Sequence, residues 1–205
     1  MSSSSSDANI SASSSGVVER DSARSRADQI GHRLFHKFAL VVADARVSNP
    51  IPVPKIKVDR WFNLDVPETD TDAFKAALGA PYRAVTALTE PLAFEMAVVL
   101  QVPELANGEA AVLNGTPIQP TRQGILLERW KMVFEPVVQN GADGVVELAT
   151  VYKQGISLFR SLFALVRVLP AWSLFRRKRG GLQLYVHIGP LDSDGSVLDF
   201  GKSAL

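Results

Sequence analysis

The segment from Val145 to Phe175 constrains the fold most, because it predicts one long helix that is apolar around most of its circumference. Arg160 and Arg167 lie inside this segment and Pro170 interrupts it. Each arginine at mid-membrane would cost about 2.5–3.5 kcal/mol, which disfavours a membrane span. We therefore predict a helix buried in the middle of a soluble domain and kinked or ended at Pro170. Its main stripe consists of Tyr152, Ile156, Phe159, Phe163 and Val166.

An earlier helix is predicted from about Asp21 to Ser48, where Pro50 forbids continuation. Residues 1–20 are rich in serine and are expected to form a disordered tail, which leaves residues 21–205 as one domain. A short helix is expected from about Thr69 to Leu78. The apolar positions of the first helix recur at helical spacing and are Ile30, Leu34, Phe38, Val41, Val42 and Ala45.

Three segments predict β-strands. Residues 92–102 alternate between apolar and polar side chains, and residues 125–134 place Leu126, Trp130, Met132 and Phe134 on one face. These two strands are expected to pair antiparallel across a long loop, and residues 182–188 predict a third strand. The turn from Asp59 to Leu64 carries two adjacent aromatic residues that are expected to plug the edge of the core. The pattern indicates an α+β domain.

The sequence offers no catalytic constellation that we would assign. It contains no cysteine, and it lacks the phosphate-loop, dinucleotide-binding and nucleophile-elbow motifs, so we predict a non-enzymatic binding module without cofactor or metal. His32 and His36 are one helical turn apart and could share a metal, but a solvated helix face is favoured. The net charge of +1 gives no argument for nucleic-acid binding.

Two groups of basic residues are candidates for binding. The run Arg176, Arg177, Lys178 and Arg179 either interacts with a helix C-terminus, which we favour, or contacts an anionic membrane or an acidic partner. Arg129, between Glu128 and Trp130, either forms a local ion pair with Glu95, Glu128 or a neighbour, which we slightly favour, or binds a phosphate or carboxylate.

Three motifs, in order and spacing, resemble the N-terminal HORMA domain of the autophagy-related protein 13 family. They are Trp61-Phe62-Asn63-Leu64, Leu127-Glu128-Arg129-Trp130, and the segment from Val151-Tyr152-Lys153 to Val168-Leu169-Pro170-Ala171-Trp172. The resemblance covers roughly Ile30 to the end of the chain and is of the fungal type. It implies a HORMA fold, in which a mainly antiparallel sheet packs on a long central helix with additional helices.

The resemblance also implies a function. Members of the family are non-catalytic scaffold and regulatory subunits of the autophagy-initiating protein kinase complex in the cytoplasm. They act at the phagophore assembly site, where they recruit the autophagy vesicle protein and a lipid-kinase complex. In many species they pair with a second HORMA protein, autophagy-related protein 101. The alternatives are a HORMA adaptor of the checkpoint or meiotic type and a membrane-surface module.

In fungal members two basic residues hold a phosphate-like anion, and the resemblance places them at Arg129 and near Lys202. Lysine stands where arginine is expected at the second position, and it offers a point charge instead of a planar fork. The chain is expected to stop before the last strands of a HORMA domain and before the kinase-binding tail.

Overall fold

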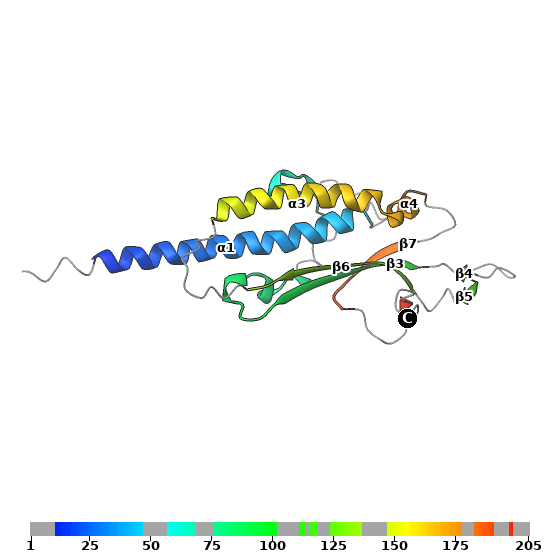
Figure 1. The fold of residues 1–205 in the computed structure, drawn as a ribbon, viewed down its shortest axis with the longest axis horizontal. Coiled ribbons are helices and arrows are strands. Elements are labelled where there is room, and N and C mark those ends of the chain that lie inside the picture. The colour runs from blue at the N-terminus through cyan, green and yellow to red at the C-terminus, as the bar shows by residue number, and fades with distance from the viewer. Residues whose placement is uncertain are drawn as a thin grey trace, which may run out of the picture.

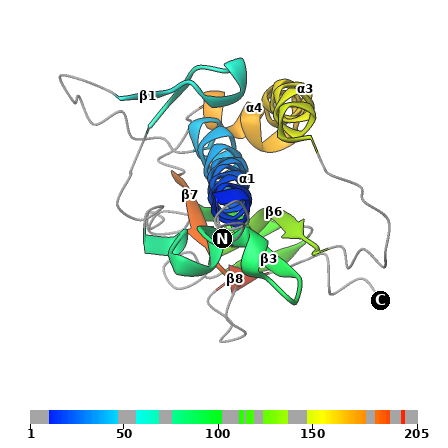
Figure 2. The ribbon, with the colours of Figure 1, turned by 90° about the vertical axis from the view of Figure 1, so that its left-hand side faces the viewer.

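The computed structural model describes residues 11–46, 57–68, 76–101, 111–113, 115–118, 124–136, 147–177, 183–190 and 197–198. Helix α1 (Ser11–Asp44) lies between the sheet and helix α3 (Leu148–Val168), and the short helix α4 (Pro170–Arg177) follows α3 (Figures 1 and 2). The described residues therefore form an α+β arrangement of three layers, which confirms the predicted fold class.

The main sheet has the strand order β7-β3-β6-β8. Its strands are β3 (Leu92–Gln101), β6 (Gly124–Phe134), β7 (Gln183–Ile188) and β8 (Val197–Leu198). Strand β3 is antiparallel to β6 and β7, whereas β8 runs parallel to β6. The predicted antiparallel pair and the predicted third strand are thus confirmed.

The pairing of β3 with β6 is irregular at one position. Val98 pairs with Glu128, but the next residue, Val99, pairs with Leu126, so Leu127 is an extra residue in β6. Leu127 packs against the core in the same cluster as Trp130 and Met132. The prediction that Leu126 shares this face was wrong, because an inserted residue breaks the alternation on which it rested.

Smaller elements lie around this framework. Strands β1 (Val58–Asp59) and β2 (Val66–Pro67) form a hairpin that encloses the turn η1 (Trp61–Asn63). Two further turns, η2 (Ala80–Tyr82) and η3 (Val85–Ala87), precede β3. Strands β4 (Ala111–Leu113) and β5 (Thr116–Ile118) form a second hairpin at one end of the molecule (Figure 1). Most of the helix predicted over residues 69–78 lies outside the described residues.

The centre of the core is α1, not the later helix. The seven consecutive residues of α1 from Lys37 to Ala43 are all buried, and Phe35 is buried as well. Helix α3, by contrast, leaves Leu158, Leu165 and Val168 exposed, the last by 77%. The prediction that residues 145–175 form the buried central helix was therefore wrong, because apolar side chains on its outer side are open to solvent.

The helix boundaries differ from the predicted ones at the N-terminus. Helix α1 begins at Ser11, so it extends into the segment predicted to be a tail, while residues 1–10 lie outside the described part. Helix α3 ends at Val168, and α4 starts at Pro170 as predicted for a proline break. No single helix among the described residues is long and apolar enough to cross a bilayer; α3 and α4 reach that length only as a pair bent by 64°.

A buried ion pair attaches the end of α1 to the sheet. The Arg46 side chain has no exposed area, and its Nε and Nη2 atoms each donate to a carboxylate oxygen of Glu128 at 2.9 Å. Glu128 also accepts a hydrogen bond from Trp130 Nε1 at 2.9 Å. A bidentate contact of this kind fixes both distance and orientation, so it sets where α1 ends above β6.

We expect Glu128→Gln to lower the free energy of unfolding by about 3 kcal/mol, because it leaves the Arg46 charge buried and unpaired. The same substitution at Glu95 is the matched control, since Glu95 pairs at 2.9 Å with Lys131, whose side chain is 53% exposed. That change should cost less than about 1 kcal/mol. Urea unfolding measures both variants, and equal losses would contradict this description of the Arg46 contact.

Candidate functional site

The turn from Trp61 to Leu64 has a backbone shape that few sequences adopt. Phe62 has φ 58° and ψ 33°, and Asn63 has φ 49°, so two consecutive non-glycine residues are left-handed. Asparagine tolerates this region, but a bulky residue such as phenylalanine does so only when its surroundings hold it there. The Phe62 side chain is completely buried. The prediction that this aromatic pair plugs the edge of the core is confirmed for Phe62.

A buried lysine on α1 organises this turn. The Lys37 ammonium group forms an ion pair with the Asp59 carboxylate, and it donates to the backbone oxygens of Asp59 at 3.2 Å and Leu64 at 2.7 Å. An ammonium group has three N–H donors, and all three partners belong to the segment from Asp59 to Leu64. The Asp59 Oδ1 atom also accepts from the Trp61 backbone N–H at 3.2 Å. The cation therefore sets both ends of the turn.

Helix α3 holds the turn from the other side. The Tyr152 hydroxyl accepts a hydrogen bond from the Phe62 backbone N–H at 3.1 Å, and the two rings stack with centroids 5.0 Å apart. The Phe159 ring lies 4.9 Å from the Phe62 ring. Gly155 makes room for this contact, since a Cβ atom there would lie 2.6 Å from Phe62 Cδ1. The turn thus joins α1 to α3.

Sequence reasoning missed Lys37 and Arg46 as structural residues. Lys37 follows Leu34 by three residues and precedes Val41 by four, which places it on the apolar face of α1. A charged residue inside an apolar stripe was the available signal for a buried, paired cation. Its partner Asp59 could not be identified in the same way, because no local spacing links the two positions.

The two histidines of α1 are not on a solvated face, so that prediction was wrong. His32 and His36 are partly buried, and their rings stack with centroids 6.3 Å apart. Neither Nδ1 atom has a hydrogen-bond partner in the described structure. Burial lowers the pKa of both imidazoles, with Asp59 opposing this shift at His36. Among the described residues, no group of three histidine, aspartate or glutamate side chains is placed to hold a metal.

The structure places Arg129 on the outer face of the sheet. Arg129 is exposed on β6 and pairs in register with Ala97 of β3. Glu95 and Glu128, which are two of the ion-pair partners predicted for Arg129, contact Lys131 and Arg46 respectively. Lys202 lies outside the described residues, so the expected pairing of Arg129 with Lys202 stays a prediction.

The basic run lies at the end of α4. Arg176 is exposed, and its guanidinium carbon lies 5.8 Å from the centroid of the Trp172 ring. Trp172 itself stacks on Phe175, with ring centroids 5.2 Å apart. Arg177 is the last residue of α4, and Lys178 and Arg179 lie outside the described residues.

Gly155→Ala tests the contact between the turn and α3. In an open helix this change would stabilise the protein by up to about 1 kcal/mol, because alanine has the higher helix propensity. Here the new methyl group meets the buried Phe62 ring, and overpacking of this kind costs about 1–3 kcal/mol. We therefore expect a net loss in chemical denaturation, with Ser157→Ala on the exposed side of α3 close to neutral. A stabilised Gly155→Ala variant would contradict the close contact.

The histidines predict a loss of stability in acid. Because the pKa of each is lowered in the folded state, the unfolded chain binds protons more readily once the pH falls below about 6.5. The contribution of the two neutral histidines to the free energy of unfolding is therefore fully present above about pH 6.5. It is lost as the pH falls from there towards the lower pKa of the folded state. His36→Gln should flatten the fall in melting temperature between pH 7 and pH 5, whereas His187→Gln should not. An unchanged slope in the His36 variant would show that this site does not carry the effect.

Comparison with known proteins identifies relatives of the chain. The sequence model of the family described as Autophagy-related protein 13 matches residues 32–189. Curated relatives include Autophagy-related protein 13 of Penicillium rubens, which is 32% identical over 77% of this chain and 18% of the relative. Its counterpart in Scheffersomyces stipitis is 27% identical over 75% of this chain and 22% of the relative. The chain therefore spans about a fifth of the length of these relatives.

A solved structure also resembles the chain. The Atg13 HORMA domain aligns with a TM-score of 0.47 and 22% identity, over 83% of this chain and 71% of the other. The three motifs that carried the resemblance in the sequence lie within the segment that the family model matches, and that segment extends from the buried half of α1 to the end of β7. The chain belongs to the autophagy-related protein 13 family.

Proposed function

We propose that this chain is a HORMA-type adaptor, and that it acts as a non-catalytic part of a scaffold and regulatory subunit of the autophagy-initiating protein kinase complex. The observation that carries the proposal is the family match over residues 32–189, which spans more than three quarters of the chain. The same match favours autophagy over a checkpoint or meiotic role.

The buried charged groups of the protein form structural ion pairs, and this supports the proposed adaptor function. Lys37 is engaged with Asp59, and Arg46 with Glu128, so these pairs hold helices to the turn and to the sheet. Partners would then be met by exposed side chains on a rigid framework, as is usual for binding residues. We expect these partners to be the autophagy vesicle protein, the lipid-kinase complex and a second HORMA protein at the phagophore assembly site in the cytoplasm.

Binding to purified candidates tests the adaptor function. The immobilised chain is mixed separately with the second HORMA protein, the vesicle protein and the lipid-kinase complex, and direct capture of at least one is expected. The Gly155→Ala variant, whose framework is weakened at the turn, shows whether capture depends on the folded state. Failure of all three candidates to bind the folded chain would overturn the recruitment role.

We also propose that Arg129 contributes to binding a phosphate-like anion together with Lys202. Arg129 lies on β6 two residues before Lys131, on the same exposed face. Its planar guanidinium can make two parallel hydrogen bonds to a phosphate, whereas the ammonium group of Lys131 can only act as a point charge.

Arg129→Ala should weaken phosphopeptide binding about tenfold or more, as expected for the loss of a charge-assisted contact. Lys131→Ala removes a neighbouring charge from the same strand and is expected to change affinity about twofold. Isothermal titration calorimetry measures the affinities, and thermal unfolding checks that both variants keep a similar melting temperature. A large fall in melting temperature for Arg129→Ala would assign that residue a structural role instead.

A further inference from the structure

The charges of the chain are distributed unevenly between its layers. Residues 148–177, which contain α3 and α4, have five basic residues and no acidic residue. The rest of the chain has seventeen basic and twenty-one acidic residues and therefore a net charge of −4. The overall charge of +1 thus conceals a strongly positive helical layer on a negative body.

This layer also exposes large apolar side chains. Leu158 is 52% exposed, Leu165 is 46% exposed and Val168 is 77% exposed, all on α3, and Leu174 of α4 is 40% exposed. They account for half of the large apolar side chains that are exposed among the described residues. On α3 they recur at intervals of seven and three residues, so they share one side of the helix.

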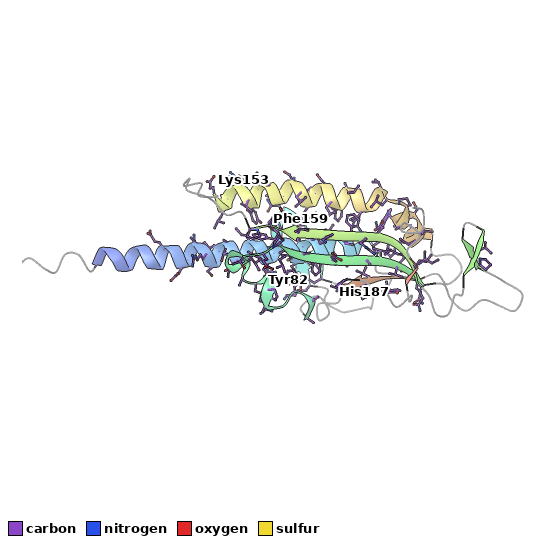
Figure 3. All side chains as sticks on the ribbon, turned by 60° about the horizontal axis from the view of Figure 1, so that its bottom comes forward. Tyr82, Lys153, Phe159 and His187 are labelled. Atoms are coloured by element: carbon purple, nitrogen blue, oxygen red, sulfur yellow. The ribbon has the colours of Figure 1, made fainter. Side chains whose placement is uncertain are left out.

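The inner side of α3 is committed to the core. Phe159 and Val166 are fully buried, and the Phe159 ring packs against Phe62 of the turn. Figure 3 shows Phe159 on the side of α3 that faces the rest of the protein and Lys153 on its outer side. In Figure 1, α3 and α4 lie on the side of α1 opposite the sheet. The outer face is therefore accessible without unfolding of the core.

Basic residues flank the apolar stripe. Lys153, Arg160 and Arg176 are exposed. Arg167 forms an ion pair with Asp44, and its guanidinium carbon lies 3.4 Å from the centroid of the Phe163 ring. The Trp172 ring lies beside Arg176, and aromatic residues next to basic ones are typical of protein surfaces at the boundary between lipid and water.

We propose that the outer face of α3 and α4 docks on an anionic lipid membrane, with Leu158, Leu165, Val168 and Leu174 entering the interface and Arg160 and Arg176 contacting headgroups. The absence of acidic residues from both helices makes the face complementary to a negatively charged surface. Ser157, Ser161 and Ala164 separate the apolar side chains, so the face is a row of single anchors on a convex helix. Individual anchors suit a fluid lipid surface better than a protein partner, whose interface needs a contiguous packed core. The proposal does not depend on the adaptor function proposed above.

Vesicle flotation tests this surface with the whole chain. Vesicles of phosphatidylcholine alone are compared with vesicles that also contain phosphatidylserine, and binding is expected only to the second kind. Arg160→Gln combined with Arg176→Gln should weaken the partition about thirtyfold, since each basic residue near an anionic surface contributes about fivefold. Leu165→Ser combined with Val168→Ser should weaken it about tenfold or more.

Matched controls use exposed residues elsewhere. Arg24→Gln with Arg26→Gln removes the same charge from the N-terminal part of α1, and Val133→Ser removes an exposed apolar side chain from β6. Both controls should stay within about twofold of the unmodified chain. Circular dichroism checks the folding of every variant.

Three outcomes would overturn the proposal. The first is no flotation of the unmodified chain with phosphatidylserine vesicles. The second is a loss of vesicle binding in the Arg24/Arg26 control that equals the loss in the Arg160/Arg176 variant. This result would show that the membrane attracts the overall charge of the protein and not the face formed by α3 and α4. The third is unchanged flotation of the Leu165/Val168 variant together with an altered sedimentation coefficient, which would identify a second copy of the chain as the occupant.

Discussion

The ammonium group of Lys37 is the contact on which the arrangement of the helices depends. It is buried on α1, and its three hydrogen-bonding partners are all oxygen atoms of the segment from Asp59 to Leu64. A buried cation without such partners would be strongly destabilising, so the helix and the turn can only form together. With the ends of the turn fixed, Phe62 is held in a left-handed conformation and its ring reaches α3. One lysine thereby determines how the outer helix is attached.

This attachment explains why the protein has two different faces. On the far side of α1 the strand β6, paired with β3, presents Arg129 and Lys131 on the outer face of the sheet. On the near side α3 is anchored by Tyr152 and Phe159, which leaves its opposite side uncovered. The exposed side chains of both faces therefore stand on a framework that is held together by buried contacts.

The sequence predicts those features that depend on short-range periodicity. The alternation in residues 92–102 and 125–134 correctly gave two antiparallel strands, and Pro170 correctly marked the break between α3 and α4. Which helix is central could not be read in the same way. Lys37 and Arg46 make the predicted first helix look amphipathic, although their charges are neutralised by residues that are distant in the chain. The many apolar residues of α3 made that helix look buried on all sides. No local pattern in the sequence indicates that Leu158 and Val168 are exposed. The extra residue in β6 likewise comes from pairing with β3, and no pattern within β6 indicates it.

Native-state hydrogen exchange tests most directly whether α1 is the centre of the fold. The amides between Phe35 and Ala45 are expected to exchange only through global unfolding, together with those of β3. The amides of α3 are expected to exchange faster, through an opening that detaches α3 from the Trp61–Leu64 turn while α1 stays on the sheet. Slower exchange in α3 than in this part of α1 would contradict the account.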